Sequence, residues 1–534
     1  MMQLVRPAGS SESAPSCPRR RIQLDVEPGE TWWGGSVGDG SKMPYGLSPF
    51  SRDLSFTTPP NGEQSGASSN QSSPLLISTT GRVVWSERPF TFGFSDGRLT
   101  VVGQEITSFR HGHSLREAFM EASRRFFPPS GRAPAIEIFT GPQYNTWIDQ
   151  PHRPTQKTVL TYARELLDAG MPPGVVCIDD CWSPGYGTWY FDTARFPDPS
   201  AMVKQLHDWG CSVMLWLVPF IDQDNDSFQF LETRQFLLRD KDGNTAIRRW
   251  WNGESALLDL SNPDAIAWFT NQLDAVMRET GVDGFKFDGG DVHDHRIDDM
   301  TARPATPVDM CQAWAELGLR YSFNEFRACW RLGGQPLAQR LRDKPATWGD
   351  DGLGSLIPEM LAQSMIGHCF TCPDMIGGGE ISTAPKQGNT DQEFFVRYAQ
   401  IAALSPIAQF STSPPRVLDD PHLAAVRQAI RLRDEMRPTL LRLVEKAAAT
   451  GEPIVVPMAF YASGLDAVTD QYFFGPDMIV APVLKPGATS RRVLLPEGQW
   501  RGVSGDIVTG PATVDVACGL DTTPRFVKVP TQQA

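Results

Sequence analysis

The sequence predicts an α/β protein built on a (β/α)8 barrel, or TIM barrel, with an N-terminal antiparallel β-domain and a C-terminal β-sandwich domain. Three observations favour this fold class. Helix-like segments alternate with short apolar strands in the middle of the chain, both flanks show short strands separated by turn residues, and acidic side chains gather where the middle strands end. Strands that are apolar on both faces and follow a helix are typical of a parallel sheet covered by helices.

The length of the chain predicts several domains. A chain of 534 residues is too long for one hydrophobic core, and domains of the usual size would divide it into about two to four. We expect a disordered tail, an N-terminal β-domain, the barrel and a C-terminal β-domain. Their expected ranges are 1–22, 23–130, 131–435 and 436–534.

The N-terminal β-domain is indicated by "RIQLDVEPGETWWGG" and "PLLISTTGRVVWSERPFTFGFSDGRLTVVG". Both show short alternating runs separated by turn residues. A loop rich in Ser, Pro, Gly and Asn is expected from about 52 to 74,. The segment "SLREAFMEASRRFF" then predicts a helix, because Ser114 and Glu117 are spaced as a capping box,.

The helices of the predicted barrel are marked by their ends. "TVLTYARELLDAG" stops at Gly170, and "DPSAMVKQLHDWG" starts with Asp198 as its N-cap and Pro199 at the first helical position,. "NPDAIAWFTNQLDAVMRETG" has a similar Asn-Pro start and stops at Gly281. Each of these helices is followed by an apolar strand, as a barrel requires.

Eight segments are expected to form the barrel strands. In chain order they are "AIEIFTGPQYNTWI", "GVVCIDDCW", "CSVMLWLVPF", "VDGFKFDGGD", "YSFNEFRA", "ATWGDD", "GHCFTCPDM" and "IAQFSTSP". After about residue 435, the pattern returns to short strands such as "PIVVPMAF", "DMIVAPVL", "RRVLLPEGQW" and "RFVKVP", which predict the C-terminal β-sandwich or part of one,.

Composition excludes some partners. The formal net charge of −13 argues against nucleic acid, whose recognition needs basic surface. No apolar run approaches the roughly 18–20 residues that cross a bilayer, so no membrane partner is expected. The N-terminus shows no export signal, and the nine cysteines are expected to be free thiols in a reducing, cytoplasmic compartment.

The strand ends predict a carboxylate site. Asp288 closes "GFKF", and Lys286 lies on the same strand face, where its charge would keep Asp288 ionised,. Cleavage of a glycosidic bond needs one ionised and one protonated carboxyl group across the scissile bond. Asp350 suits the second role, because Trp348 and the neighbouring Asp351 would both favour its protonated form,.

Each motif alone has a structural explanation. Lys286 and Asp288 are compatible with an ion pair, the acids of "IDDCW" with a helix cap, "WGDD" with a turn, and Trp216 with a filled barrel core,. The stronger indication is that acids end several strands of one barrel, whose C-terminal ends converge on one face.

A metal site is the main rival chemistry. "HGH" at 111–113 and "HDH" at 293–295 each place two histidines two residues apart. The first precedes a helix outside the barrel and the second lies in a loop, so we expect no metal. "CFTC" at 369–372 has no second pair, and the glycines at 377–379 lack the strand–turn–helix context of a nucleotide loop,. No cofactor is expected.

Several motifs in one order resemble glycoside hydrolase family 31, the retaining α-glycosidases. They are "WWGG", "VVCIDDCW", "SVMLWLVPF", "GFKFDGGD", "WGDD", "PDMIGGG" and "FFGPDMIVAPVLKPGATSRRVLLPEGQW". Within the family, "RACWRLGGQPLAQR", "GLGSLIPEML", "PDMIGGG" and "QFSTSPPRVLD" are most similar to the branch that contains myogenesis-regulating glycosidase, a branch associated with α-galactosidase activity.

The resemblance implies roles for individual residues. Asp288 is implied as the nucleophile and Asp350 as the acid/base. The terminal sugar would be lined by Asp180, Trp216, Lys286 and Arg340, with Asp179, Trp348 and Asp374 as further matched positions. A carbohydrate substrate is implied, and a homo-oligomer is compatible with the family.

Two departures from the family pattern keep alternatives open. Many members have Trp-Ser-Gly-Asp-Asn around the acid, whereas this chain is one residue tighter, so Asp351 stays a candidate acid. Many α-glucosidases also carry a sugar-binding histidine near strand eight, which "FSTSPPRVLD" lacks. An α-glucosidase or other α-glycosidase of the same family, and a carbohydrate-binding protein without turnover, are the alternatives to an α-galactosidase.

Overall fold

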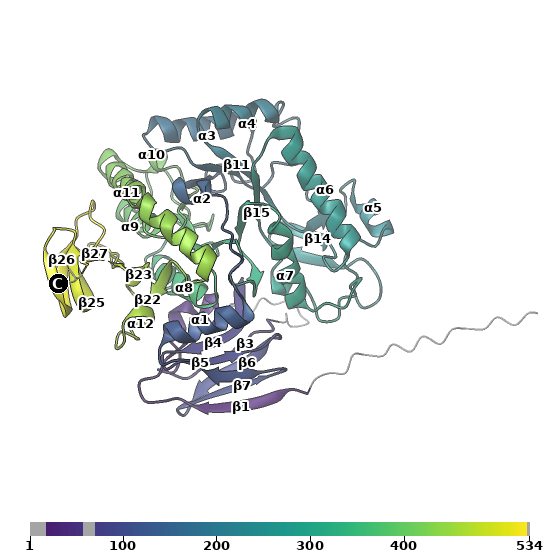
Figure 1. The fold of residues 1–534 in the computed structure, drawn as a ribbon. Coiled ribbons are helices and arrows are strands. Elements are labelled where there is room, and N and C mark those ends of the chain that lie inside the picture. Colours follow the sequence, from purple (N-terminus) through teal and green to yellow (C-terminus); the bar gives the residue numbers. More distant parts are fainter. Residues whose placement is uncertain (1–17, 57–69, 531–534) are drawn as a thin grey trace, which may run out of the picture.

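The computed structural model describes residues 18–56 and 70–530. A barrel with its helices forms the centre, two antiparallel sheets lie on one side of it, and a C-terminal sheet lies on another (Figure 1). Most of the expected tail and of the loop expected over 52–74 lies outside the described residues. Strand β1 begins at Arg20, so the last residues expected in the tail belong to a sheet.

The N-terminal part contains two sheets. One has the strand order β1-β7-β6-β3, and the other has β17-β4-β5-β8 with β2 also paired to β4. Their elements are β1 Arg20–Asp25, β2 Trp32–Ser36, η1 Val37–Lys42, β3 Phe50–Asp53, β4 Gln71–Ser78, β5 Arg82–Trp85, β6 Phe90–Ser95, β7 Arg98–Gly103, β8 Thr107–Arg110 and α1 Leu115–Phe126. All eight residues of β4 are buried, as is expected of a strand paired on both sides and covered on both faces.

The N-terminal sheets are tied to the barrel by a short strand from a barrel loop. Strand β17 (Cys329–Trp330) pairs in parallel with β4, opposite Gln71 and Ser72. The side chain of Gln71 also donates hydrogen bonds to the backbone carbonyls of Arg327 (2.9 Å) and Arg340 (2.6 Å). The N-terminal part therefore helps to position the loop that carries Arg327 and the strand that carries the buried Arg340.

The barrel sheet has the order β19-β18-β16-β15-β11-β10-β9-β21-β20, with parallel pairing throughout. Its strands are β9 Gln143–Asn145, β10 Val175–Ile178, β11 Ser212–Leu217, β15 Gly284–Phe287, β16 Phe323–Phe326, β18 Ala338–Arg340, β19 Phe370–Cys372, β20 Met375–Ile376 and β21 Gln409–Phe410. Only Pro373 and Asp374 separate β19, which pairs with β18, from β20, which pairs with β21. Counting these two as one interrupted strand, eight strands close the barrel at this seam.

One expected barrel strand is wrong. The segment 346–351 forms turns, and the sixth strand is instead the fully buried Ala338–Arg340. Pro345, Gly349 and Gly352 suit turns better than a central strand. Gly352 is required here, because a Cβ at this position would lie 2.2 Å from the carbonyl oxygen of Thr347.

The helices cover the outside of the barrel (Figure 1). They are α2 Glu137–Thr140, α3 Gln156–Asp168, α4 Pro199–Asp208, α6 Pro263–Thr280, α7 Pro307–Gly318, α8 Leu353–Met365, α9 Gln392–Ala403, α10 Pro414–Val417 and α11 Asp420–Thr450. The residues predicted to begin α4 and to end α6 do so in the structure. The Asp198 carboxylate accepts from the Ala201 N–H at 2.9 Å at the start of α4, and Gly281 takes a left-handed conformation (φ 83°) after α6,.

A small subdomain is inserted between β11 and α6. It contains the three-stranded antiparallel sheet β12-β14-β13 and one short helix. The elements are β12 Phe220–Asp222, α5 Phe228–Thr233, β13 Ile247–Trp250 and β14 Gly253–Leu257. The turn between β13 and β14 carries Trp251 and Asn252.

The C-terminal part is a sheet of order β22-β23-β24-β27-β25-β26. Its elements are β22 Val455–Pro457, α12 Met458–Tyr461, β23 Tyr472–Phe474, β24 Met478–Val480, β25 Ser490–Gly502, β26 Ile507–Ala517 and β27 Arg525–Lys528. Helix α11 lies between this sheet and the barrel (Figure 1) and runs through position 435 as far as Thr450. The β pattern therefore resumes at Val455, later than expected, because Gly451 rather than Pro438 ends the helix,.

Candidate active site

Asp288 lies directly after β15 on the C-terminal face of the barrel. Its backbone N–H donates to the Leu217 carbonyl of the neighbouring strand at 2.9 Å. The indole N–H of Trp216 donates to Asp288 Oδ2 at 2.8 Å, and the Gly289 N–H donates to Asp288 Oδ1 at 2.9 Å. The chain then turns through Gly290 (φ 68°), where a Cβ would lie 2.5 Å from the Trp314 ring. The glycines of "FDGGD" thus let the strand end in a sharp turn beside the carboxylate.

Two cations face the Asp288 carboxylate. Arg327 Nε lies 2.8 Å from Asp288 Oδ1, and Lys286 Nζ lies 3.9 Å from Asp288 Oδ2. Burial alone would raise the pKa of Asp288, but the charges of Arg327, Lys286 and Arg340 and the hydrogen bond from Trp216 outweigh it,. The pKa of Asp288 is therefore held well below its usual range, and the carboxylate stays ionised at neutral pH.

Lys286 connects two of the predicted residues. Its ammonium group donates to Asp179 Oδ2 at 2.7 Å, and the Asn145 amide donates to the same oxygen at 2.8 Å. Lys286 lies on β15, Asp179 follows β10 and Asn145 ends β9, with β11 between β15 and β10, and all three side chains are buried. The pKa of Lys286 is raised despite its burial, because Asp179, Asp288 and Glu325 are close. The structure thus brings Asp179, Lys286, Trp216 and Asp288 together.

Arg340 forms a second buried charge cluster. Its guanidinium contacts Glu325 Oε1 at 3.0 Å, Asp374 Oδ1 at 2.6 Å and Asp343 Oδ1 at 2.8 Å. Only 1% of the Arg340 side chain is exposed. Much of its donor capacity is therefore used within the protein, where it connects β16, β18 and the residues that follow β18 and β19.

Asp374 anchors two loops. Its Oδ2 accepts from the backbone N–H groups of Lys344 (2.7 Å) and Gly379 (2.9 Å), while Oδ1 accepts from Arg340. Burial raises the pKa of Asp374, and the charge of Arg340 opposes this shift. Asp374 therefore fixes the start of the loop that leads from β18 to α8.

Asp350 lies in that loop and is exposed. Backbone hydrogen bonds make the loop compact, since the Leu353 N–H donates to the Thr347 carbonyl at 2.9 Å and the Gly354 N–H to the Gly349 carbonyl at 3.0 Å. Within residues 18–56 and 70–530, the Asp350 carboxylate makes no hydrogen bond or ion pair. Asp351 is also exposed and accepts a hydrogen bond from Thr347 Oγ1 at 3.3 Å.

Trp348 contacts the start of α9. Its indole N–H donates to Asp391 Oδ2 at 2.8 Å, and its ring contacts Phe394 edge-on at 5.7 Å between centroids. Both partners belong to the start of α9, so Trp348 attaches the Asp350 loop to a barrel helix. In the described part of the chain, no hydrogen bond connects Trp348 to the Asp288 cluster.

Asp180, which follows Asp179, is held by a separate set of donors. Tyr186 Oη donates to its two oxygens at 2.9 and 3.0 Å, and Asn252 Nδ2 donates to Oδ2 at 2.8 Å. His152 Nδ1 lies 3.2 Å from the same oxygen. Burial raises the pKa of Asp180, and the charge of Asp179 adds to this shift.

Several site residues are not identified by strand patterns alone. They are Arg327, Glu325, Asn145, Tyr186, Trp251, Asn252 and Gln71. Arg327 and Glu325 could have been found from the sequence, because both lie near the end of the predicted strand "YSFNEFRA", where Glu325 pairs in register with Lys286. Trp251 and Asn252 come from the inserted subdomain, and Gln71 comes from the N-terminal sheet, so only tertiary structure brings them here.

The structure bears on the expectations about membrane-spanning helices and cysteines. A helix long and apolar enough to span a bilayer is not found among the described residues. The eight cysteines in that part of the chain are free thiols.

The "HGH" motif lies before α1, outside the barrel, whereas His293 of "HDH" lies with Asp291 and Asp294 in a group whose ligand atoms are within 4.8 Å of one another. Asp291 and Asp294 cap η2 (Val292–Asp294), and Asp291 also pairs with Arg327, so this group has a structural role.

Comparison with known proteins identifies the family. Residues 139–443 match the sequence profile described as the glycosyl hydrolases family 31 TIM-barrel domain, and residues 451–530 match the glycosyl hydrolase family 31 C-terminal domain. The first match alone covers more than half of the chain. This chain belongs to glycoside hydrolase family 31.

Curated relatives support the same family. Myogenesis-regulating glycosidase from Mus musculus is 35% identical over 418 residues, which are 76% of this chain and 57% of the relative. Alpha-xylosidase XylQ from Lactiplantibacillus pentosus is 26% identical over 477 residues, which are 82% of this chain and 60% of the relative. The family 31 chain described here thus spans less than two thirds of the length of these two relatives.

Solved structures confirm the fold. A family 31 dextranase from Flavobacterium johnsoniae, complexed with glucose, has a TM-score of 0.84 at 19% sequence identity, covering 96% of this chain and 66% of that chain. A family 31 alpha-xylosidase from a soil metagenome has a TM-score of 0.80 at 20% identity, covering 96% of this chain and 80% of that chain. The predicted TIM barrel with an N-terminal antiparallel β-domain is therefore confirmed, and the C-terminal part, which was predicted as a β-sandwich, is a β-domain formed by the sheet β22-β23-β24-β27-β25-β26.

Proposed function

We propose that this family 31 chain is a retaining exo-α-glycosidase that hydrolyses terminal α-linked galactose. The observation that carries the proposal is the state of Asp288. A buried carboxylate with one indole N–H, one backbone N–H and two cations around it is an anion at neutral pH, which is the state that a glycosidase nucleophile requires,.

In the proposed reaction, Asp288 attacks the anomeric carbon of the terminal sugar. The bond from Asp288 to this carbon forms as the glycosidic bond breaks, and Asp350 gives its proton to the departing oxygen. Water then attacks the anomeric carbon of the glycosyl-aspartate, Asp350 takes one proton from this water, and Asp288 leaves as a carboxylate. The product retains the α configuration. No cofactor enters this cycle.

The residues around Asp288 would also bind the sugar. Asp180, Lys286 and Asp179 offer both acceptors and donors for hydroxyl groups at the ends of neighbouring strands. Trp251, on the turn of the inserted sheet, is 48% exposed, and Arg327 lies over its ring at 4.8 Å from the centroid. We place the leaving group against this exposed indole face, next to the cation that contacts the nucleophile.

The choice of galactose depends on the family branch. The quoted motifs and the 35% identity to myogenesis-regulating glycosidase favour that branch. The segment after β21, "FSTSPPRVLD", also lacks the histidine that many α-glucosidases of the family carry. An α-glucosidase or another α-glycosidase is the second candidate, because relatives named alpha-xylosidase and alpha-glucosidase also match.

One experiment tests the mechanism and the sugar together. The protein is incubated with 5-fluoro-α-galactosyl fluoride and, in parallel, with 5-fluoro-α-glucosyl fluoride, and the labelled peptide is identified by mass spectrometry. We expect the galactosyl reagent to label Asp288 faster. Faster labelling by the glucosyl reagent would favour the α-glucosidase, a label on another carboxylate would contradict the role of Asp288, and no label with either reagent would favour a binding protein. Proton NMR of the first product should show the α anomer, and a β anomer would contradict retention.

A further inference from the structure

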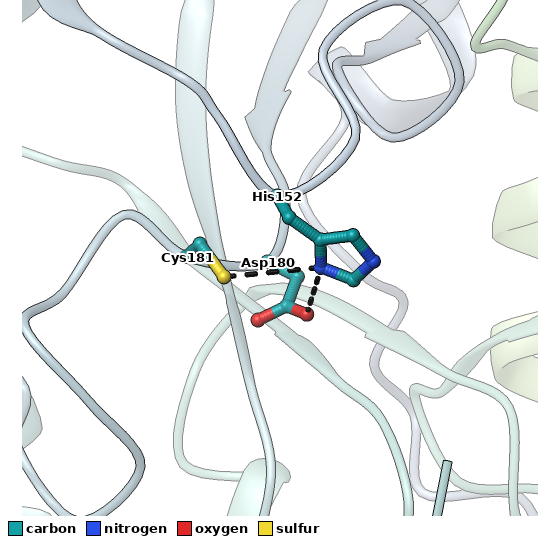
Figure 2. A group of neighbouring side chains, drawn as sticks. All are labelled: His152, Asp180 and Cys181. Atoms are coloured by element: carbon teal, nitrogen blue, oxygen red, sulfur yellow. Dashed lines mark hydrogen bonds and ion pairs between the residues drawn. The ribbon is translucent and has the colours of Figure 1, made fainter. Parts of the chain in front are cut away.

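His152, Asp180 and Cys181 form a compact group beside the Asp288 cluster (Figure 2). His152 lies in the loop after β9, whereas Asp180 and Cys181 follow β10. Figure 2 shows the Nδ1 edge of the imidazole turned toward both the Asp180 carboxylate and the Cys181 sulfur. The proposed catalytic cycle uses neither His152 nor Cys181.

The three ligand atoms have the spacing of a metal centre. His152 Nδ1 lies 3.2 Å from Asp180 Oδ2 and 3.9 Å from Cys181 Sγ, and all three atoms lie within 4.8 Å of one another. In a tetrahedral zinc site with bonds of about 2.0–2.3 Å, ligand atoms are about 3.3–3.7 Å apart. The two distances from His152 Nδ1 are close to these values, and a cation can therefore bind all three atoms after side-chain shifts of up to about 1 Å,.

The donor set favours a thiophilic cation. One imidazole nitrogen, one carboxylate oxygen and one sulfur suit Zn²⁺ or Co²⁺, whereas Mg²⁺ and Ca²⁺ prefer oxygen alone. Hydrogen bonds from Tyr186 and Asn252 hold the Asp180 carboxylate in place, in the manner of groups that orient metal ligands from behind,. The acceptor oxygen is thus positioned before a cation arrives.

The group is also accessible. The His152 side chain is 45% exposed, while the Asp180 side chain is 1% exposed. Among the eight cysteines in the described ranges, Cys181 alone is not buried. A cation can therefore enter from the His152 side.

We propose that His152, Asp180 and Cys181 bind one thiophilic divalent cation, Zn²⁺ before others. The thiol releases its proton to solvent as the sulfur–metal bond forms. Because the cation occupies an oxygen of Asp180, it competes with the sugar for this carboxylate. Inhibition of turnover by zinc therefore rests on the proposed function, whereas the binding of the cation does not.

Cobalt provides the direct test. The reduced full-length protein is titrated with Co²⁺, which gives a near-ultraviolet charge-transfer band when sulfur is a ligand and intense visible bands when the site is tetrahedral. We expect one equivalent to produce both, and excess Zn²⁺ to remove them. Cys181→Ser should lose the charge-transfer band, and His152→Ala should weaken binding at least tenfold. Cys518→Ser, which changes a buried thiol in the C-terminal part, should behave like the wild type.

Three results would overturn the proposal. They are no charge-transfer band in the wild type, the same band in Cys181→Ser, or unchanged affinity in His152→Ala. Thermal melting of each variant without metal checks that it is folded, and Cys181→Ala provides a second variant if Cys181→Ser is not.

Turnover is measured separately. With an aryl α-galactoside, Zn²⁺ should raise the apparent KM of the wild type and leave kcat unchanged, and Cys181→Ser should be at least tenfold less sensitive. A sugar-independent, equal inhibition of both proteins would contradict competition at Asp180 without affecting the cobalt result. If the wild type cleaves no glycoside, the proposed function fails, and the cobalt spectra still decide the metal site.

Discussion

The two carboxylates proposed to act on the glycosidic bond lie in opposite surroundings. Asp288 ends a buried strand, and its side chain contacts Trp216, Lys286 and Arg327. Asp350 lies in a loop, is exposed, and has no side-chain partner within the described residues. One carboxylate is fixed by the barrel itself, and the other is carried by a segment that the barrel only anchors.

This difference suits the two proposed roles. A nucleophile must stay ionised through the whole cycle, which the cations around Asp288 ensure. An acid/base must gain and lose a proton, and paired cations would hold it in one state. The Asp350 loop is instead positioned through its backbone and its neighbours, by Asp374 at one end and Trp348 against α9.

The largest effect is expected for Asp288→Ala. Removing the nucleophile should lower kcat on an aryl α-galactoside by a factor on the order of 10⁴ or more. Added azide should then yield β-galactosyl azide, since it attacks the face that Asp288 leaves open. Asp242→Ala, on an exposed turn, is the control and should keep full activity. Equal turnover in Asp288→Ala and the control would remove Asp288 from the mechanism.

A smaller, substrate-dependent loss is expected for Asp350→Ala. Turnover of a disaccharide, whose leaving group needs a proton, should fall by a factor on the order of 10²–10⁴. Galactosyl fluoride, which needs less assistance, should be affected much less, and azide should give α-galactosyl azide. Asp351→Ala is the matched variant one residue away and should stay within a few-fold of the wild type. The reverse pattern would make Asp351 the acid.

The cations can be tested through the pH profile. In Arg327→Met, the charge that most strongly lowers the pKa of Asp288 is gone while burial persists, so this pKa rises. The acidic limb of kcat/KM should therefore move to higher pH by about 1–3 units. Arg249→Met, which changes an exposed arginine of β13, should leave the limb in place. An unmoved limb in Arg327→Met would show that Asp288 does not need this cation.

The smallest effect is expected on the leaving-group side. Trp251→Ala removes the exposed ring and its contact with Arg327, a contribution of about 0.5–1 kcal/mol,. The KM for an aryl galactoside should rise about two- to fivefold with little change in kcat. Galactosyl fluoride has no extended leaving group and serves as the internal control. An equal rise for both substrates would place Trp251 against the terminal sugar instead.

Much of the barrel was predictable because its signals are local. The ends of α4 and α6 follow from Asp198 and Gly281, and the strand that carries Lys286 and Asp288 follows from its apolar run and terminal glycines. The contact between Lys286 and Asp179 could also be expected, since the C-terminal ends of the parallel barrel strands converge on one face,.

Other features depend on long-range contacts. The sixth strand was misplaced because "PLAQR" contains polar side chains, which are typical of exposed segments. In the structure Arg340 is buried, and its charge is paired with Glu325 and Asp374. Trp348 was expected to favour the protonated form of Asp350, and its hydrogen-bond and ring partners lie at the start of α9, some forty residues later in the chain. No sequence motif marks the residues that come from the inserted sheet and from β4. Trp251 lies on a turn of the inserted sheet, and Gln71 is held by the hydrogen bonds of its amide group.

The junction between β19 and β20 has a mechanical consequence. A closed sheet is weakest where one strand changes partner, and here the change occurs across Pro373 and Asp374. The same aspartate accepts hydrogen bonds from Arg340 of the neighbouring strand β18 and from two backbone amides. These contacts couple the closure of the barrel to the position of the Asp350 loop. A fluctuation that separates the strands at this junction would also release the segment that carries the proposed acid/base.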